Sequence, residues 1–471
     1  MHKPVTLSSF TAQVIAGLPF APNHEQEIAI AKISEFILEN DERGVFILKG
    51  YAGTGKTNLI SAITKSLPNI KWRSVLLAPT GRAAKVISNY SQNQAQTIHK
   101  KIFRKEIVSD GSVHFSLAEN LHKNTLFIVD EASMIGADSN NDTLLGSLLE
   151  NLFEYIYSGH NCKLILVGDT AQLPPIGTDL SPALDKDYLS RVFYLNIRQF
   201  ELTEVARQRL DSGILLNATT IRNTLFKENF HFPKLVCRKD FIRINGEELE
   251  DVLNSCVSNY GEENMIIITR SNKRANLFSQ SFRNRIKLYE EDICAGDKIM
   301  IVKNNYYWLP GTGLEASFIA NGDMADITKI TKRESLYGFN FCDCKIKLND
   351  SNELIVKLIT DCLYTDDPSL NTERLTTLYQ NVLADVQDEP VKGLRMAYLK
   401  NSPYFNALQV KFSYAITCHK SQGGQWPVVF IDQGYLKDEG LNENFARWFY
   451  TAITRATEKV YLVNFNDLFF N

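Results

Sequence analysis

The residues V-F-I-L-K-G-Y-A-G-T-G-K-T-N-L-I, from Val45 to Ile60, decide the fold of this chain. The apolar run from Val45 to Leu48 is typical of a buried parallel strand, Gly50 to Thr57 match G-x-x-x-x-G-K-[ST] in full, and a helix follows. This order of strand, glycine-rich turn and helix predicts a loop that binds the phosphates of a nucleotide. The alternative, a strand-to-helix turn without a ligand, is the weaker interpretation in this setting.

Each residue type in the loop follows from the chemistry of a triphosphate. Gly53 and Gly55, with Thr54 between them, let backbone N–H groups close around the phosphates. Lys56 reaches the β- and γ-phosphates, and the Thr57 hydroxyl is placed to ligate Mg²⁺. We therefore expect ATP and Mg²⁺ as cofactors.

Composition places the chain among ordinary globular proteins. Its 471 residues, 44% of them apolar, are enough for about three domains. The 51 basic and 54 acidic residues give a net charge of −3, so a nucleic-acid partner would need a local basic groove. The eight scattered cysteines favour buried reduced thiols in a cytoplasmic protein over disulfides or a zinc site. No apolar stretch has the length of a membrane span or the pattern of a signal peptide.

A helix is expected just before the loop, over residues 22–40, because apolar residues recur there at helical spacing after a capping Asn23. Gln26 near the start of this helix has two interpretations. A polar surface residue is the default, but a glutamine immediately upstream of a phosphate loop reads the adenine edge in some ATPases. We favour the second role.

A second strand end brings polar residues to the same edge of the sheet. The stretch V-L-L-A-P-T-G-R-A-A-K-V-I, from Val75 to Ile87, predicts a strand, a turn and a helix. Ligands of parallel sheets bind beyond the carboxyl ends of the strands, so Thr80, Gly81 and Arg82 fall on the functional edge.

Residues 101–122 predict a projecting hairpin, because Asp110-Gly111 lies between alternating residues. The segment follows T-I-H-K, which begins at Thr97. Its flank places Phe103 among basic residues, a mixture that suits a nucleic-acid strand and equally a solvated ribbon.

The stretch L-F-I-V-D-E-A-S-M-I, from Leu126 to Ile135, is an apolar strand that runs into Asp130-Glu131. After a complete phosphate loop this pair predicts the other half of an ATPase site. Asp130 would hold Mg²⁺ through water, and Glu131 would orient and deprotonate the attacking water. The next strand leads to Gln172 on a turn bounded by prolines, where it senses the γ-phosphate or merely ends the sheet.

These stretches resemble a known family. G-Y-A-G-T-G-K-T, L-A-P-T-G-R-A-A, T-I-H-K, V-D-E-A-S-M and G-D-T-A-Q-L-P-P are similar to motifs I, Ia, Ib, II and III of superfamily 1 helicases of the RecD/Dda type, which move 5′ to 3′ on single-stranded DNA. Further along, L-T-E-V-A-R-Q, S-Y-A-I-T-C-H-K-S-Q-G-G-Q-W and Y-T-A-I-T-R-A resemble motifs IV, V and VI. Because the motifs stand in the family's order, coincidence is negligible.

The resemblance implies roles for residues in both halves of the chain. Arg207 and Arg455 would reach the γ-phosphate from a second domain, and Gln422 and Gly423 would lie beside the nucleotide. The strand contacts that it implies are Thr80, Thr97, His99, Thr417, His419 and Lys420; Gly81, Phe103 and Arg270, which follows the strand at Ile266 to Thr269, complete the expected DNA-binding set.

The expected fold is α/β, with two RecA-like P-loop NTPase domains, a β-hairpin insertion in the first and an SH3-like β-barrel insertion in the second. The expected ranges are 1–190 for the first domain, 191–290 and 406–471 for the two parts of the second, and 291–405 for the inserted barrel with a helical subdomain. The chain length around the motifs predicts a minimal motor, without a nuclease or an N-terminal extension.

The expected function is an ATP- and Mg²⁺-dependent 5′ to 3′ DNA helicase that acts on single-stranded DNA and duplex junctions, in repair, recombination or replication. We expect a monomeric motor in the cytoplasm, at the nucleoid when it acts, with single-strand-binding or replication proteins as partners. Two alternatives stay open: a translocase that strips proteins from DNA without unwinding it, and an RNA helicase of the same superfamily. The direction of movement follows from the family likeness alone.

Overall fold

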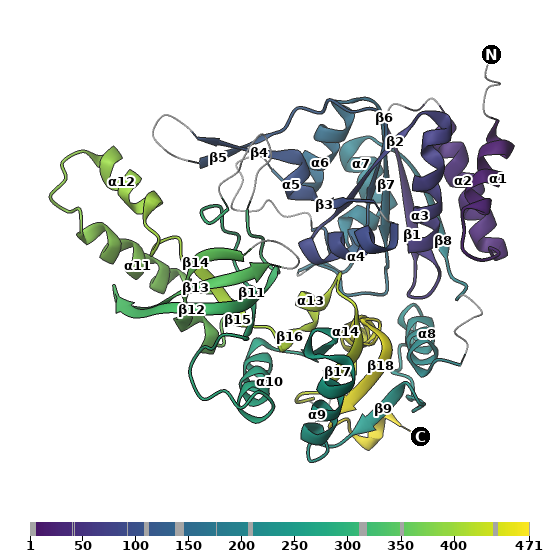
Figure 1. The fold of residues 1–471 in the computed structure, drawn as a ribbon. Helices are drawn as coiled ribbons and strands as arrows, with labels where there is room; N and C mark the ends of the chain where they lie inside the picture. The colour runs from purple at the N-terminus through teal and green to yellow at the C-terminus, as the bar shows by residue number, and fades with distance from the viewer. Residues whose placement is uncertain are drawn as a thin grey trace.

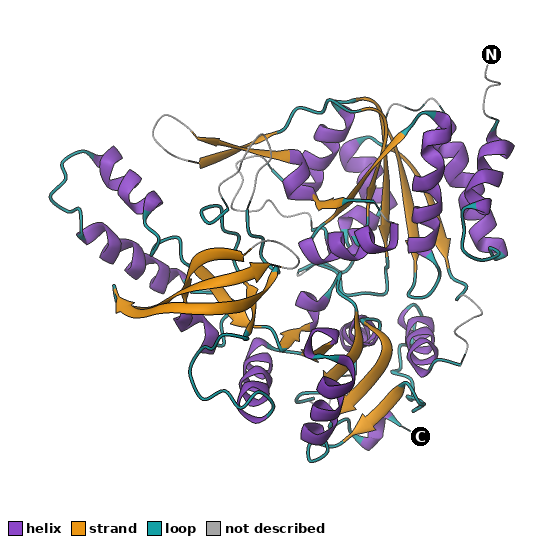
Figure 2. Cartoon of the chain, viewed as in Figure 1, coloured by secondary structure: helices purple, strands orange, loops and turns teal. Residues whose placement is uncertain are grey.

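The computed structural model describes residues 6–39, 41, 43–91, 93–107, 113–136, 146–175, 177–205, 211–309, 318–348, 353–436 and 441–470. These residues form two domains, each built on a parallel sheet, and a small closed barrel (Figure 1). Figure 2 shows helices enclosing the strands of both sheets. The architecture confirms the expected α/β class with a barrel insertion.

The first domain holds a six-stranded parallel sheet in the order β3-β2-β6-β7-β1-β8. Its strands are β1 (Gly44–Gly50), β2 (Arg73–Ala78), β3 (Ala95–Thr97), β6 (Lys123–Val129), β7 (His160–Gly168) and β8 (Asn196–Leu202). The middles of β1, β6 and β7 are buried on both faces, which explains the continuous apolar runs in their sequences. The loop after β1 therefore opens at the carboxyl edge of the sheet, beside the ends of β6 and β7.

Helices cover both faces of this sheet. On one face the packed helices are α1 (Leu7–Ala16), α2 (His24–Leu38), α3 (Lys56–Ser66) and α4 (Gly81–Ser91); on the other they are α5 (Ile98–Ile102), α6 (Leu148–Tyr157) and α7 (Lys186–Phe193). The expected helix before the phosphate loop is α2, and its capping Asn23 accepts a hydrogen bond from the backbone N–H of Gln26. Two layers of apolar side chains thus fix the sheet.

A two-stranded hairpin projects from the first domain (Figure 1). It consists of β4 (Phe103–Ile107) and β5 (Val113–Leu117), which pair antiparallel. The predicted Asp110-Gly111 turn lies outside the described residues.

The second domain is built on a five-stranded parallel sheet in the order β16-β10-β17-β18-β9. The strands are β9 (Phe241–Ile244), β10 (Met265–Thr269), β16 (Ala415–Thr417), β17 (Trp426–Asp432) and β18 (Ala456–Val463). The helices around this sheet are α8 (Gly213–Leu225), α9 (Leu249–Tyr260), α10 (Asn272–Arg285), α13 (Cys418–Ser421) and α14 (Glu443–Ile453). The aromatic residues of α14 are buried, and the helix faces the first domain.

A five-stranded barrel is inserted between β10 and β16. Its strands are β11 (Lys298–Ile301), β12 (Met324–Leu336), β13 (Phe339–Leu348), β14 (Glu353–Ile359) and β15 (Leu408–Phe412). A helix pair, α11 (Thr372–Ala384) and α12 (Lys392–Asn401), connects β14 to β15 and extends away from the barrel (Figure 1). This is the expected barrel with its helical subdomain.

Two strands lie beyond the expected domain limits. β8 begins at Asn196, past residue 190, yet pairs with β1 in the first sheet. Its sequence N-I-R-Q-F-E-L is half polar, as suits an edge strand. β15 begins at Leu408, past residue 405, and closes the barrel by pairing with β11. The range of each body follows these pairings.

Two expectations from composition can be compared with the structure. All eight cysteines are free thiols, and six of them are buried. No helix in the described part of the chain combines the length and the hydropathy that a membrane span requires.

Candidate functional site

The phosphate loop joins the end of β1 to the start of α3. Gly53 and Gly55 have φ angles of +80° and +88°, a left-handed region that favours glycine, so the loop can turn tightly. The first turn of α3 has no side-chain cap, which leaves its N–H groups to a ligand. The Lys56 Nζ donates to the carbonyls of Gly50 (2.5 Å) and Tyr51 (3.0 Å), across the mouth of the loop. The free N–H groups of α3 and the Lys56 ammonium thus form a site that can bind an anion such as a phosphate.

Gln26 braces this loop from α2. Its side-chain Nε2 donates to the Thr54 carbonyl at 3.0 Å, and its Oε1 accepts from the Asn23 N–H at 3.1 Å. The residue is 2% exposed, and a Cβ on Gly55 would come within 2.6 Å of the same Nε2. The side chain of Gln26 thus holds Thr54 in place, and its amide keeps a second N–H and a second lone pair, so the predicted contact with an adenine edge stays a prediction.

Asp130 and Glu131 follow β6 at the carboxyl edge of the sheet. Glu131 has φ +52°, and its N–H donates to Asp130 Oδ1 at 2.9 Å. Two effects raise the pKa of Asp130 to about 6: the larger is desolvation, and the smaller is the negative charge of the neighbouring Glu131 carboxylate. Two carboxylates held together at a partly buried position are an arrangement that a cation or a proton would stabilise.

The second domain supplies the opposite wall through Arg455, which comes just after α14. Its guanidinium is 4% exposed; Nε donates to the Thr451 carbonyl at 3.1 Å, and Nη1 lies 3.7 Å from Glu131 Oε1. The arginine therefore points across the interface at the first domain. The other expected arginine, Arg207, lies outside the described residues.

A cavity of about 470 Å³ lies between these walls. Predicted residues that line it are Gly53, Gly55, Lys56, Thr57, Asp130, Glu131, Gln172, Gly423 and Arg455. Its lining also includes Phe20 and Pro19, between α1 and α2, which sequence reasoning missed. An aromatic residue just upstream of the expected helix was the available signal, and its ring suits the face of a nucleobase.

Gln172 stands at the floor of this cavity. It is 6% exposed, and its Oε1 is buried without a hydrogen-bond partner among the described residues. A buried polar atom of this kind normally has a partner, so a ligand or water at the cavity floor would satisfy it.

The loop from Asp169 to Leu173, which carries Gln172, is held by the second domain. The Leu173 N–H donates to Thr451 Oγ1 at 2.8 Å, and Gln422 Nε2 donates to the Leu173 carbonyl at 2.7 Å. The Arg447 guanidinium donates to the carbonyl of Thr170. Gln422 was expected beside the nucleotide; in the structure its amide instead contacts the loop that borders the nucleotide cavity.

A second cavity, of about 370 Å³, collects the predicted strand contacts. The first domain contributes Thr80, Thr97 and His99, and the second contributes His419 and Lys420. Burial lowers the pKa of His419 and lowers that of Lys420 to about 8. Residues from segments far apart in sequence thus converge on one pocket.

The barrel forms a third wall of this strand pocket, which sequence reasoning missed. Asn304, Phe318 and Asn321 line the pocket from the turns next to β11 and β12. The turn at Asp323 also reaches the first domain, because a Cβ on Gly81 would come within 2.6 Å of the Asp323 carboxylate. A polar and aromatic lining without a distinctive local pattern left no signal in the sequence.

Four predicted strand contacts do not line the strand pocket. Phe103 is 4% exposed and packs in the core of the first domain, so its ring offers no face to a base. The guanidinium of Arg270 lies over the rings of Phe445 (5.3 Å) and Trp448 (5.7 Å) and donates to the carbonyl of Tyr435. Thr417 ends β16 immediately before the helix that carries His419, and Gly81 begins α4 next to Thr80.

Two family models match the chain, an AAA domain over residues 22–232 and a UvrD-like helicase C-terminal domain over residues 412–463. The first covers the wall with Lys56 and the second the wall with Arg455. In this pair of matches the chain is similar to superfamily 1 helicases.

Three similar proteins each span more than half of the chain. An uncharacterised protein of Acanthamoeba polyphaga mimivirus is 26% identical over 93% of the chain and 99% of its own length. The ATP-dependent DNA helicase dda of Enterobacteria phage T4 is 26% identical over 59% of the chain, which spans 62% of dda. The ATP-dependent DNA helicase Pif1 of Campylobacter jejuni is 23% identical over 90% of the chain and 91% of its own length. The solved structure of the Pif1 helicase from Bacteroides in complex with ADP-AlF3 and ssDNA is 15% identical. The match covers 96% of this chain and 95% of the solved chain, with a TM-score of 0.47.

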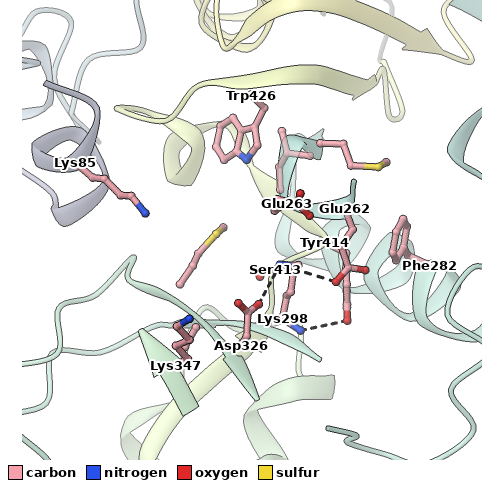
Figure 3. A pocket seen from close by; sticks show the side chains of 14 residues that line it. Lys85, Glu262, Glu263, Phe282, Lys298, Asp326, Lys347, Ser413, Tyr414 and Trp426 are labelled. Carbon is pink, nitrogen blue, oxygen red and sulfur yellow. Dashed lines mark hydrogen bonds and ion pairs between the residues drawn. The ribbon is translucent and has the colours of Figure 1, made fainter. Parts of the chain in front are cut away.

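A third cavity, of about 340 Å³, lies where the two domains and the barrel meet (Figure 3). Lys85 of α4 and Trp426 of β17 face Lys298 and Asp326 of the barrel across it. The Lys298 Nζ lies 3.0 Å from Asp326 Oδ1, an ion pair within the barrel. Because its polar lining includes such internal pairs, we interpret this cavity as the joint between the three bodies.

Proposed function

We propose that the chain is an ATP-dependent DNA helicase that moves 5′ to 3′ along single-stranded DNA and unwinds the duplex ahead. One observation carries the proposal: the interface that brings Arg455 within 3.7 Å of Glu131 also forms the strand pocket. The relatives named ATP-dependent DNA helicases in phage T4 and Campylobacter jejuni support the substrate. The direction rests on the resemblance to the RecD/Dda type.

In this proposal the cleft hydrolyses ATP only when both walls meet. The Lys56 ammonium turns from the Gly50 and Tyr51 carbonyls to the β- and γ-phosphates, and the first turn of α3 donates its N–H groups. Arg455 adds a positive charge to the transition state, and Glu131 accepts the proton of the attacking water. Release of the products would weaken the attraction between the walls.

The donor set of the cleft fits Mg²⁺. Thr57 supplies a hydroxyl and Asp130 a carboxylate, both lining the same cavity, and Mg²⁺ prefers such oxygen ligands. Desolvation and the neighbouring Glu131 carboxylate raise the pKa of Asp130, and a bound cation would stabilise its charged form. When bound, Mg²⁺ would neutralise charge that develops on the phosphate oxygens.

Helix α13 links hydrolysis to the strand. His419 and Lys420 on this helix line the strand pocket, and Gln422 directly after it donates to Leu173 beside the nucleotide cavity. A displacement of the 169–173 loop would therefore move the strand contacts of the second domain. Repeated closure and opening would advance the strand through the pocket in steps.

The projecting β4–β5 hairpin favours unwinding over the stripping of bound proteins. A two-stranded ribbon next to the strand pocket is the kind of element that separates two DNA strands, and it follows directly after α5, which carries the pocket residue His99. We propose that one chain suffices, acting at the nucleoid on single-stranded DNA and duplex junctions, with single-strand-binding or replication proteins nearby.

A fluorescence unwinding assay tests the proposal with three duplexes that carry a 5′ DNA tail, a 3′ DNA tail or a 5′ RNA tail. We expect ATP-dependent strand separation only with the 5′ DNA tail. Unwinding of the 3′-tailed duplex would refute the direction, and preference for the RNA tail would make the chain an RNA helicase. DNA-stimulated ATP hydrolysis without unwinding of any duplex would favour the translocase.

A further inference from the structure

The hydroxyl of Tyr450 connects the two halves of the nucleotide cleft. It donates to Asp169 Oδ2 at 2.7 Å and accepts from the N–H of Ala52 at 3.0 Å. Ala52 belongs to the phosphate loop and Asp169 to the loop that carries Gln172, both in the first domain. Tyr450 stands on α14 of the second domain, so its single oxygen bridges two loops of the opposite body.

The surroundings make both hydrogen bonds costly to lose. Tyr450 and Asp169 are each 1% exposed, and the other carboxylate oxygen of Asp169 accepts from the Ala171 N–H at 2.9 Å. Burial raises the pKa of Asp169, while the Lys56 charge and the Tyr450 hydroxyl act to lower it. Without the tyrosine, a buried carboxylate oxygen and a loop N–H would both lose a partner.

We propose that Tyr450 is a positioning residue that sets the phosphate loop and the Gln172 loop relative to each other when the cleft closes. Lys56 and Gln172 then face the nucleotide from fixed places, and both contacts must break when α14 withdraws. When the domains close, the two hydrogen bonds of Tyr450 form, and the two loops take their correct relative positions at the same time. The inference rests on the proposed function, since it concerns how that ATPase is coupled to domain movement.

Thr451 strengthens the argument, because the next residue of the same helix contacts the same loop. The Thr451 Oγ1 accepts a hydrogen bond from the Leu173 N–H. Helix α14 therefore contacts both ends of the 169–173 loop, at Asp169 and at Leu173. Of these two neighbouring residues, Tyr450 is the one whose hydroxyl also contacts the phosphate loop, so its role differs from that of Thr451.

The variant Tyr450→Phe tests this role by removing only one oxygen from a buried ring. Steady-state ATP hydrolysis is measured with and without oligo-dT. We expect kcat with oligo-dT to fall about tenfold or more, because the lost bonds include one to a charged group. The KM for ATP should change much less, because the first domain holds the ground-state nucleotide.

The chain offers a matched control in Tyr414. Its hydroxyl donates to the buried Asp297 at 3.0 Å and accepts from the Lys298 N–H at 3.2 Å, but at the joint with the barrel (Figure 3). Arg283 also binds that carboxylate. Tyr414→Phe should leave kcat and its stimulation by oligo-dT at wild-type values, with at most a lower melting temperature. A purely structural role for Tyr450 would give the same result in both variants.

A double-mutant cycle with Asp169→Asn tests the same hydrogen bond from its other side, and Asp169→Asn alone should lower kcat if Tyr450→Phe folds poorly. Because both residues act through one hydrogen bond, the losses in kcat should be non-additive, with the double variant close to the worse single variant. Folded Tyr450→Phe with wild-type kcat would overturn the inference, as would additive losses. A wild-type chain without DNA-stimulated hydrolysis would instead refute the proposed function.

Discussion

The nucleotide cleft and the strand pocket lie at the same domain interface but are built differently. The cleft has two walls, each carrying fixed charges: Lys56, Asp130 and Glu131 on one side and Arg455 on the other. The strand pocket has three walls, because the barrel adds Asn304, Phe318 and Asn321. The chemistry thus depends on a few charges, while the grip on the strand is shared among many contacts, of which Lys420 and Arg82 are charged and most of the others are neutral.

This difference in charge predicts a difference in sensitivity. Removing a charge from the cleft should stop hydrolysis, because each one acts on the transition state in a place with little water. Removing one contact from the strand pocket should weaken DNA binding modestly, since stacking and neutral hydrogen bonds each contribute little. Variants of the two regions can therefore separate hydrolysis from grip.

Lys56→Ala should have the largest effect. Removal of the ammonium that reaches the phosphates should lower kcat for ATP hydrolysis by about 1,000-fold or more. A coupled-enzyme ATPase assay measures the loss, with a melting curve to show that the variant folds. Lys65 near the end of α3 provides the control, and Lys65→Ala should keep wild-type turnover; a comparable loss there would contradict the assignment.

Arg455→Ala should come next. The Arg455 guanidinium acts on the transition state from the second domain, so we expect kcat to fall by about 100-fold or more, with a much smaller change in ATP affinity. Steady-state kinetics and equilibrium binding of a fluorescent ATP analogue give the two numbers. Near-normal kcat in a folded variant would mean that Arg455 does not serve this cleft.

His419→Ala should affect the strand pocket and leave the cleft intact. Loss of one ring contact should weaken the affinity for oligo-dT by about three- to tenfold. Fluorescence anisotropy measures this affinity, and ATP hydrolysis at saturating oligo-dT should stay near the wild-type rate. A large loss of hydrolysis under saturation would show that the two regions cannot be separated.

Asn321→Ala should have the smallest effect and sharpens the comparison, because it tests the barrel wall alone. We expect about a twofold loss of affinity for oligo-dT in the same anisotropy assay. Ile355→Ala is the control, since Ile355 is 68% exposed on the same barrel and does not line the pocket. Equal effects of the two variants would remove the barrel from the strand pocket.

The parts that could be predicted are those in which a short stretch specifies its own structure. The phosphate loop from Gly50 to Thr57 and the pair Asp130-Glu131 follow buried strands of a parallel sheet, so their arrival at one edge followed from topology. The barrel was also expected, because the resemblance to the helicase family implies one at this place in the chain. In each case local pattern and tertiary structure agree.

The parts that were missed depend on contacts between distant segments. Phe103 stands among basic residues, yet the chain turns its ring into the core of the first domain. The role of Tyr450 requires two loops from another domain, and no spacing within motif VI indicates them.

The central claim is that one nucleotide is clasped by both domains at the moment of hydrolysis. Competition against a fluorescent ADP tests it, with ADP and aluminium fluoride as a mimic of the transition state, in the presence of Mg²⁺ and oligo-dT. The account predicts that wild type binds the mimic about 100-fold or more tightly than ADP and that Arg455→Ala loses this gain. A folded Arg455→Ala variant that keeps the full gain would contradict the claim.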